Sequence, residues 1–479
     1  MSDDNGKSGY KVRYIAITDI QKKNWNPYTE IDDVESLVRL LLYSNEIQIE
    51  GIIPCTSVYK KKIRKSDVAC VHEVIQAYGQ AWHNLKQHAD GFPTEKMLHG
   101  AVKRGIPSFG KKAGCGFASR RYNQNEGVRH IINVVDKDDS RPVWIGLWGG
   151  ANTLAQAIWQ VEQERSLQEM KLFLAKLRIY GISDQDAASR WMRNRYGKHL
   201  FYIVSPSIGT VSGNGKTFCN AVWPGISCDE FSHGSEDGIS GGGFTGACKA
   251  VIQKEWLKEH IADVGSYGAC YPLPVFCMEG DSPSFMGLID NGLNEPEHPE
   301  YGGWGGRYEY KIPQKLAGMD EEICPVWTNS TDRVMGEDRK EHCSPQASIW
   351  RWRRDFQMDF ASRMQWTVTA DYAKGVHRPV VSVDCDDRIE MKAGECRNIS
   401  AVKSHDKNGR NLEFQWFVYG EAGSCRREVE LAGNRMPTVC VKVPEESEAG
   451  ETVHLILAVR GKEEVFMTSY KRIVIEIRD

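Results

Sequence analysis

Acidic side chains stand where three strand-like or helix-like segments of the sequence begin or end. Asp19 follows the apolar run 12–17, Asp32 and Asp33 open a helical pattern, and Asp281 follows the apolar stretch PLPVFCM. Calcium takes six to eight oxygen ligands from carboxylates, carbonyls and water, so acids gathered from such places suit it. A carboxylate that ends a buried strand must also find a partner. Together these acids could close one calcium site from distant parts of the chain.

Each acidic group also has a simpler interpretation. Asp32 could do no more than cap the helix that follows it. The segment 279–283, EGDSP, is also a good turn sequence. The spacing alone leaves both alternatives open.

Two glycine-rich motifs could shape a binding site. In the segment 148–155, WGGANTLA, a strand ends, two glycines free the backbone and a helix opens at Asn152. Such a turn can offer a carbonyl to a metal or an N–H to an anion, although a Gly-Gly turn is not specific. The segment 301–308, YGGWGGRY, interleaves aromatic residues with glycines around Trp304 and Arg307. It predicts either an aromatic wall that stacks on sugar rings or bases, or a tightly packed irregular loop.

The elements that must position these residues alternate between strands and helices. Strands are expected at 12–17, 47–54, 142–148, 176–182 and 200–206, and helices at 33–45, 68–88, from Asn152, after Ser183 and at 345–364. This alternation predicts an α/β fold, with a mostly parallel sheet covered by helices on both faces. Ligands of such folds bind outside the carboxyl ends of the strands, where Asp19 and the turns 148–153 and 183–186 would meet. The Gly- and Ser-rich segment 207–244 is expected to be a long surface loop.

The character of the sequence changes near Arg378. About seven short alternating runs follow, separated by turn signals such as Asn408-Gly409. This pattern predicts a small immunoglobulin-like β-sandwich with Trp416 in its core. We therefore expect an α/β domain over 1–372 and a sandwich over 378–479.

Composition excludes several classes of function. The chain has 479 residues with 61 Lys and Arg against 64 Asp and Glu, a net charge of −3, which argues against a nucleic-acid partner. No apolar run is long enough to span a membrane. No apolar stretch of signal-peptide length precedes Tyr10, so secretion is not expected from the sequence as written. The 14 cysteines form no CxxC pair, so reduced thiols in the cytoplasm are expected, with secretion as the alternative if a leader was removed. P-loop, dinucleotide-binding and G-x-S-x-G motifs are also absent from the sequence.

Several long motifs resemble one family. The stretches TDI…DDVESLVRLLLYSNEIQIEGII, RPVWIGLWGGANTLAQAIWQV, KLRIYGISDQDAASRWMR and MEGDSPSFMGLIDNGL…PEHPEYGGWGGRYE are similar to the nucleoside hydrolase-like family of bacterial and fungal proteins often labelled cellulose-binding. The stretches EFQWFVYGEAG, VHLILAV and YKRIVIEI resemble its companion β-sandwich domain. The resemblance covers nearly the whole chain.

The resemblance to this family, a relative of calcium-dependent nucleoside hydrolases, implies roles for the acids. Asp19 matches the acid that ligates calcium and acts as general base on the attacking water. Asp33 and Asp281 match further calcium ligands, and Asp32 matches the acid that touches sugar hydroxyls. Asn152 lies where these enzymes offer a carbonyl to the metal and contact substrate.

Other positions match less closely. Asp184 is assigned to substrate by the same resemblance, but the Asn that binds ribose is not found before it. Trp304 and Arg307 are assigned to substrate from the aromatic and glycine pattern of the segment 301–308. Twelve residues, 20–31, separate Asp19 from Asp32, more than in the compact signature of the hydrolases. Gly280 stands where many of them carry a His that protonates the leaving base.

We therefore expect a calcium-dependent hydrolase of a glycosidic or N-glycosidic bond, with Asp19 and Asp32 as catalytic residues. Its partners would be a small sugar, nucleoside or oligosaccharide, without nucleic acid or membrane, and relatives of this kind often form homo-oligomers. The alternative is a non-catalytic protein that binds plant-type glycans through the loop 301–308 and the sandwich. A structural or interaction protein is the third candidate.

Overall fold

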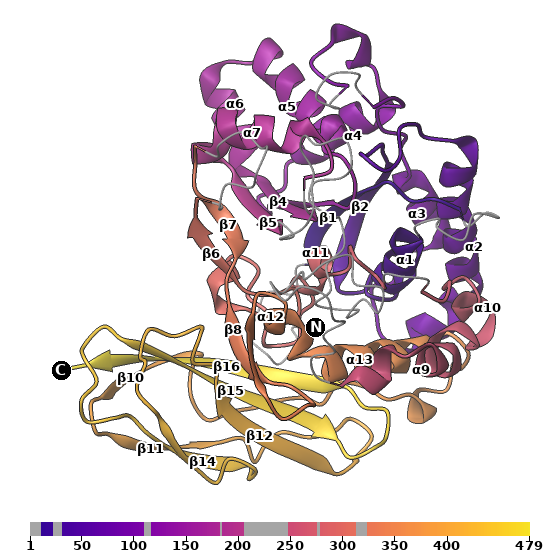
Figure 1. Ribbon diagram of the computed structural model, residues 1–479. Coiled ribbons are helices and arrows are strands. Elements are labelled where there is room, and N and C mark those ends of the chain that lie inside the picture. The colour runs from indigo at the N-terminus through magenta and orange to yellow at the C-terminus, as the bar shows by residue number, and fades with distance from the viewer. Residues whose placement is uncertain are drawn as a thin grey trace.

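In the computed structural model, a large sheet flanked by helices is followed by two smaller sheets that lie against one end of it (Figure 1). The structure describes residues 11–22, 31–109, 116–182, 184–205, 248–274, 278–312 and 323–479. The segment predicted to be a long loop, 207–244, lies outside these ranges.

The large sheet has seven strands in the order β2-β1-β3-β4-β5-β7-β6. Their bounds are β1 Val12–Thr18, β2 Ile47–Pro54, β3 Val143–Leu147, β4 Leu177–Ile182, β5 Phe201–Ser205, β6 Tyr308–Lys311 and β7 Val326–Asn329. Six strands are parallel, and β6 joins the edge antiparallel to β7. The prediction of a mostly parallel sheet is confirmed, and all five predicted strands form within two residues of their expected ends.

Strand β1 lies where the order of the sheet reverses. It pairs with β2 on one side and with β3 on the other. After β1 the chain therefore forms the edge strand β2, and it then returns past β1 to form β3 on the other side. The carboxyl ends of such neighbouring strands open a crevice in which α/β proteins bind ligands. Asp19 and Gly149 follow β1 and β3 at this point.

Both faces of the sheet are buried under helices, because side chains alternate along each strand. Ile15 and Ile17 of β1 enter one core, whereas Tyr14 and Ala16 enter the other. The first core contains residues of α4 Glu126–Val135, α5 Asn152–Glu164, α6 Leu167–Ala175 and α7 Ala187–Tyr196. The second contains residues of α1 Asp32–Leu42, α2 Lys65–His88, α11 Pro283–Met286 and α13 Arg353–Trp366. These faces confirm the predicted covering of the sheet.

Some elements were not expected from the sequence. The helix predicted over 345–364 is two helices, α12 Ala347–Trp350 and α13, with Arg351 and Trp352 between them. The remaining unpredicted elements include α3 Glu95–Ala101, α9 Lys254–Leu257, α10 Gly265–Gly268 and the hairpin β8 Asp332–Met335 and β9 Glu341–Ser344. These are short, and four to seven residues carry little periodicity. The helices α4 and α6, of ten and nine residues, were also not predicted, and their length does not explain this.

The C-terminal part forms the predicted sandwich from seven strands. They are β10 Arg388–Lys392, β11 Cys396–Ser400, β12 Leu412–Val418, β13 Glu430–Ala432, β14 Thr438–Lys442, β15 Thr452–Gly461 and β16 Thr468–Arg478. One sheet has the order β10-β16-β15-β12 and the other β11-β14-β13. Trp416 is 1% exposed in the core between them, as expected.

The sandwich docks on the α/β part through buried polar groups. The Arg472 guanidinium donates to the carbonyls of Leu293 and Gly302 at 2.7–3.1 Å. It also contacts His454 Nδ1 at 2.9 Å. Tyr470 of β16 donates its backbone N–H to Asn291 O at 2.7 Å.

Asp332 forms the centre of a second contact between the two parts. Its carboxylate accepts hydrogen bonds from Arg307 at 2.6 Å, Arg351 at 2.8 Å and the Tyr419 hydroxyl at 2.6 Å. Tyr419 belongs to the sandwich and is fully buried. We call Asp332, Arg307, Arg351, Tyr419, Arg472 and His454 the interface network.

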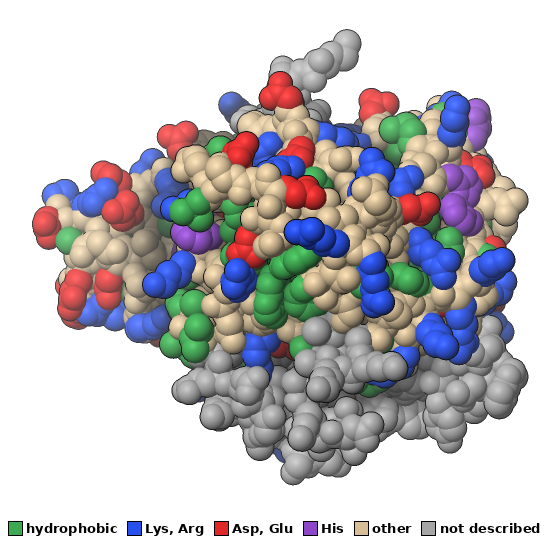
Figure 2. Space-filling view, turned by 90° about the horizontal axis from the view of Figure 1, so that it is seen from above, with side chains coloured by type: hydrophobic (Ala, Val, Ile, Leu, Met, Phe, Trp, Pro, Cys, Tyr) green, Lys and Arg blue, Asp and Glu red, His purple; other side chains and the backbone are tan. Residues whose placement is uncertain are grey.

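The surface carries charges of both signs. On the face seen in Figure 2, acidic and basic side chains are interspersed, consistent with the net charge of −3. Within the described ranges, no helix is both long and apolar enough to cross a membrane.

Candidate functional site

Three buried carboxylates meet beside the carboxyl end of β1. One oxygen from each of Asp32, Asp33 and Asp281 lies within 4.8 Å of the others. The first two come from the start of α1, and the third precedes α11, more than 240 positions later in the chain. We call these three residues the carboxylate cluster. The prediction that distant acids converge at this edge of the sheet is met for these three.

Helix capping does not account for Asp32. The residue that caps α1 is Ile31, and no side chain caps the helix by a hydrogen bond. Asp32 is the first helical residue instead. Three acids in the first turn, Asp32, Asp33 and Glu35, lie near the positive end of the helix dipole, which favours their charge.

Asp19 lies next to the carboxylate cluster but outside the group of three. Its carboxylate accepts a hydrogen bond from the Ser57 hydroxyl. The Thr18 hydroxyl, one residue earlier, donates to Asp33. Lys60 acts on Asp19 and Asp33 by its charge, while its ammonium pairs with Asp67 at 3.0 Å. Ser57 and Lys60 follow β2, and no sequence pattern had marked them as partners of Asp19.

Burial and mutual repulsion govern the charge of these acids. Burial raises the pKa of Asp33 well above its usual range, and the charges of Asp19 and Asp32 raise it further. Burial also raises the pKa of Asp19, although the Ser57 hydrogen bond and Lys60 oppose this shift. A cation among these acids would remove the repulsion that raises the pKa of Asp33.

The two glycines after β3 allow the backbone to approach these acids closely. A Cβ atom on Gly149 would lie 2.7 Å from Asp19 Oδ1 and 2.8 Å from Cys55 Sγ. A Cβ atom on Gly150 would lie 2.4 Å from Thr56 O. A larger residue at either position would collide with these groups, so the turn depends on its two glycines, as the sequence predicted.

Asn152 opens α5 directly after this turn. Its backbone N–H donates to Asp186 Oδ2 at 3.0 Å, and its side-chain amide donates to Thr56 Oγ1 at 3.2 Å. Burial raises the pKa of Asp186 to about 7, although backbone N–H groups of residues 188, 151 and 152 oppose the shift. Asn152 thus lies at the predicted edge, and its contact with a metal stays a prediction.

Two further buried acids, Glu35 and Glu279, lie beside the carboxylate cluster, and sequence reasoning did not assign a role to either. Arg39 of α1 pairs with Glu279 through both carboxylate oxygens. Glu279 donates its backbone N–H to Glu35 Oε2 at 2.8 Å. Burial raises the pKa of Glu35 well above its usual range, and the charges of Asp32 and Glu279 add to this. The spacing of Asp32 and Glu35, three residues apart on one helix face, was the available signal.

The backbone at Glu279 is held in an unusual conformation. Its φ is +51°, in the left-handed region that a residue other than glycine rarely adopts. The ion pair with Arg39 and hydrogen bonds from Tyr271 and Ser282 hold it there. Such strain is typical of functional sites, and here it lies two residues before Asp281.

The remaining predicted substrate residues are engaged within the protein. Asp184 forms a buried, bidentate ion pair with Arg193, with N–O distances of 2.6–2.7 Å. Trp304 is fully buried and packs edge to face on Phe356 and Tyr470. Arg307 belongs to the interface network and is 7% exposed. The structure does not bring these three side chains to the carboxylate cluster, so their contact with substrate stays a prediction.

This fold and site define a nucleoside hydrolase-like α/β protein that carries a companion β-sandwich. The family model described as cellulose-binding Sde182, nucleoside hydrolase-like domain, matches residues 13–308. The chain belongs to this family, because the match covers more than half of its length. The model described as cellulose-binding protein Sde0182, C-terminal domain, matches residues 398–477. The resemblance predicted from the motifs is confirmed.

One solved structure is similar over the whole length. It is a nucleoside hydrolase-related hypothetical protein from Saccharophagus degradans that is associated with carbohydrate metabolism. The two chains share 29% identity, the TM-score is 0.76, and the match covers 98% of this chain and 100% of the other. No curated protein matches the chain.

Proposed function

We propose that the protein is a calcium-dependent hydrolase of a glycosidic or N-glycosidic bond in a sugar, nucleoside or oligosaccharide. The observation that carries this proposal is the carboxylate cluster at the point where the sheet order reverses. The family membership supports the same class of substrate, because the similar protein from Saccharophagus degradans is associated with carbohydrate metabolism.

The residues of the site fit a hard cation. All three ligand groups are carboxylates, which calcium prefers over nitrogen or sulfur donors. Each of them is at most 6% exposed, so their charges are poorly screened by water. Lys60, whose charge acts on Asp19 and Asp33, already pairs with Asp67. Arg39, whose charge acts on Glu35, pairs with Glu279. A divalent ion at this place would relieve the repulsion that Asp19 and Asp32 exert on Asp33.

Asp33 and Asp281 would hold the cation, with Asp32 shared between the cation and sugar hydroxyls. When bound, calcium anchors vicinal hydroxyls and lowers the pKa of a water molecule that it coordinates. Asp19 would accept the proton of the attacking water as general base. Its raised pKa brings it closer to neutral pH, which suits a proton acceptor. The Ser57 hydroxyl and Gly149 fix the position of its carboxylate.

A hydrolysis assay tests this proposal. A panel of nucleosides and plant-type oligosaccharides is incubated with calcium, and free base and reducing ends are measured. We expect turnover that falls by at least about 100-fold in Asp19→Asn, the order of a lost general base. The control is Asp136→Asn, which breaks the partly exposed pair with Arg165 and leaves turnover unchanged. Equal turnover in Asp19→Asn and the wild type, or none on any substrate, would contradict the proposal.

Glycan binding without turnover is the second candidate function. It is favoured by the description of the family as cellulose-binding. It predicts saturable binding that survives Asp19→Asn and needs no calcium, whereas a hydrolase releases product.

A further inference from the structure

We propose that the crevice at the carboxyl end of β1 selects an acidic glycan, a chain of sugars that carry carboxylates, through a basic rim beside Asp19. The basic rim consists of six exposed side chains: Lys61, Lys62, Arg64, Lys65, Arg104 and Arg121. The inference names the substrate class of the proposed hydrolase and rests on that function for turnover, whereas binding to the basic rim does not depend on it.

The two segments that carry the basic rim differ in charge from the rest of the chain. Residues 55–66 contain five Lys and Arg, residues 102–125 contain six, and neither segment contains an acid. The whole chain, by contrast, has 61 basic and 64 acidic residues. The basic rim is therefore a local excess of positive charge on a nearly neutral protein.

The basic rim begins at the residue that holds Asp19. Ser57 donates its hydroxyl to the Asp19 carboxylate, and its carbonyl accepts a hydrogen bond from the Lys61 ammonium at 3.4 Å. The backbone N–H of Cys55 donates to Thr18 O at 2.7 Å, so this segment starts beside the end of β1. Two hydrogen bonds thus connect the first rim residue with the proposed general base.

Backbone contacts hold the two basic segments side by side. Lys62 and Ser108 form an antiparallel bridge. The backbone N–H of Phe109 donates to Lys61 O at 3.2 Å. Residues 61–65 and 104–109 therefore present their side chains on one surface.

The two arginines of the second segment reach the same surface. The Arg104 guanidinium donates to Ile63 O at 2.8 Å. Arg121 donates to the Tyr122 hydroxyl at 2.5 Å, and that hydroxyl lies 3.2 Å from Ser108 Oγ. The rim residues thus form one continuous group that extends away from Asp19.

The charge of the basic rim is not neutralised by its neighbours. Within the described ranges, none of its six side chains forms an ion pair. Of the nearest acids along the chain, Asp67 pairs with Lys60 at 3.0 Å, and Glu126 accepts a 3.4 Å hydrogen bond from the Arg104 backbone. A cleft bordered by charge of one sign attracts ligands of the opposite sign.

The length of the basic rim favours a chain of charges over a single anion. Lys61 and Lys65 are four positions apart in largely extended backbone, which spans up to about 14 Å. One phosphate or carboxylate could contact only part of this length. A glycan with a carboxylate on each sugar unit is ionised at neutral pH and meets several of these side chains at once.

The aromatic rings of this surface favour a glycan over a nucleic acid. Proteins that bind single-stranded nucleic acid stack successive bases on open rings. Here Lys61 covers the Phe109 ring at 3.7 Å, and Arg121 covers the Tyr122 ring at 4.5 Å. Tyr59 is 41% exposed, and one ring is no platform for successive bases.

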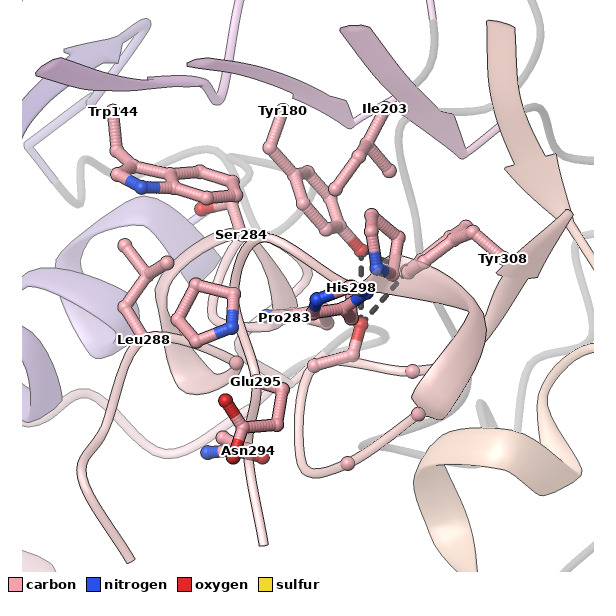
Figure 3. Close-up of a pocket in the computed structure, with 17 residues that line it drawn as sticks. Trp144, Tyr180, Ile203, Pro283, Ser284, Leu288, Asn294, Glu295, His298 and Tyr308 are labelled. Carbon is pink, nitrogen blue, oxygen red and sulfur yellow. Dashed lines mark hydrogen bonds between the residues drawn. The ribbon is translucent and has the colours of Figure 1, made fainter. Parts of the chain in front are cut away.

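The pocket drawn in Figure 3 does not offer a comparable site. Trp144, Tyr180 and Tyr308 point into it from the strands, and it encloses about 40 Å³. Its lining includes the carboxylate of Glu295 but no Lys or Arg. An acidic chain would find no compensating charge there, so binding of such a chain identifies the basic rim.

Calorimetric titration of the full chain, with calcium chelated, tests the proposal. The ligands are hexagalacturonate, hexamannuronate and the methyl ester of hexagalacturonate, which keeps the sugar chain and removes its charge. We expect hexagalacturonate, hexamannuronate or both to bind, at least about ten-fold more tightly than the ester. Salt at about 0.3 M should weaken the binding of the acids and not that of the ester.

A pair of substitutions locates the binding. Lys62→Gln combined with Lys65→Gln should lower the affinity for the bound acid about five-fold, because each exposed charge contributes modestly. The matched control is Lys403→Gln, which removes an exposed charge of the sandwich and should leave the affinity unchanged. All three lysines are exposed, so the variants should fold normally, and thermal unfolding checks this.

The outcomes separate this inference from the proposed hydrolysis. Equal affinity for acid and ester, no binding of either acid, or unchanged affinity in the rim variant overturns the inference. So does tighter binding of single-stranded or duplex DNA than of either acid. Binding of an acid without turnover of any substrate contradicts the proposed hydrolase alone. Turnover of neutral substrates without binding of either acid overturns this inference alone.

Discussion

Two buried groups of charged residues in this molecule differ in how their charge is balanced. The interface network sets Asp332 against Arg307 and Arg351, and the Tyr419 hydroxyl completes its hydrogen bonds. The carboxylate cluster brings three acids together, and burial and neighbouring charge raise the pKa of Asp33. Both lie in regions of low exposure, so burial alone does not separate them.

The difference indicates which group is structural and which is functional. Burying a charge costs free energy unless a partner compensates it. In the interface network, the charge of Asp332 is balanced by Arg307 and Arg351 of the same chain. The network joins the sandwich to the α/β part through Tyr419. In the carboxylate cluster, the charges of Asp19 and Asp32 act against the charge of Asp33, and a bound cation would relieve this repulsion. Repulsion between buried acids is therefore a better marker of a binding site than burial alone.

The largest expected effect is on the interface network. Asp332→Ala would leave the buried guanidinium group of Arg307 without its close acid, and Arg351 would keep only the longer contact with Glu421 at 3.4 Å. We expect the free energy of unfolding, measured with urea, to fall by about 3–5 kcal/mol. As a control, Glu341→Ala breaks the exposed pair with Arg333 and should cost less than about 1 kcal/mol. A small loss in Asp332→Ala would mean that this network does not hold the two parts together.

A substitution in the carboxylate cluster should raise the stability of the protein, whereas Asp332→Ala lowers it. Asp33→Asn removes an acid that Asp19 and Asp32 repel, so without calcium we expect the variant to be more stable than the wild type. Calcium at 100 times its dissociation constant should stabilise the wild type by about 2.7 kcal/mol and the variant much less. Thermal unfolding with and without calcium measures both. An equal response to calcium in the two proteins would refute the metal site, and Asp136→Asn serves as control.

A smaller effect is expected where the backbone approaches Asp19. Gly149→Ala places a Cβ atom 2.7 Å from the Asp19 carboxylate, so one of them must move. We expect a loss of about 1–3 kcal/mol in the free energy of unfolding and a weaker response to calcium. Gly100→Ala is the matched control, because nothing lies within 4 Å of its new Cβ and alanine favours its helix. Similar stability of both variants would argue against close contact at Asp19.

The smallest expected effect is the pH dependence of stability that His454 gives to the interface network. Burial and the neighbouring Arg472 lower the pKa of His454 to about 3, from 6.5. The unfolded chain therefore takes up a proton at His454 before the folded protein does. Its contribution to stability is complete above pH 6.5 and is lost as the pH falls toward 3.

Between pH 6.5 and about 5 this loss should be roughly 1–2 kcal/mol. We expect His454→Asn to show a flatter pH dependence of unfolding than the wild type. The exposed His405→Asn should not change the slope. If the slope of His454→Asn equals that of the wild type, protonation of His454 does not limit the stability of the interface.

Much of the fold could be predicted from the sequence because its strong signals are local. Apolar runs located the five central strands, and alternating runs with turn residues located the sandwich. The short elements β6 and β7 were missed because four residues carry too little pattern. The break between α12 and α13 was missed because the apolar residues 349–364 continue across it with helical spacing.

The site could be predicted only in part. Acids at the ends of apolar runs pointed to Asp32, Asp33 and Asp281 without showing which of them would share a cation. Trp304 and Arg307 were assigned to substrate from an aromatic and glycine pattern, but the structure buries both. Such a pattern describes an irregular loop and does not say which of its faces is open.

The sequence by itself determined the order of the elements, the two-part architecture and the family, because these depend on periodicity and on long contiguous motifs. Tertiary structure alone decided which charged groups meet. Asp332 finds its partners 19–87 positions away in the chain, and Asp281 meets Asp32 across more than 240. Electrostatic energy depends on distance in space and on access of water, and neither quantity can be read from spacing along the chain.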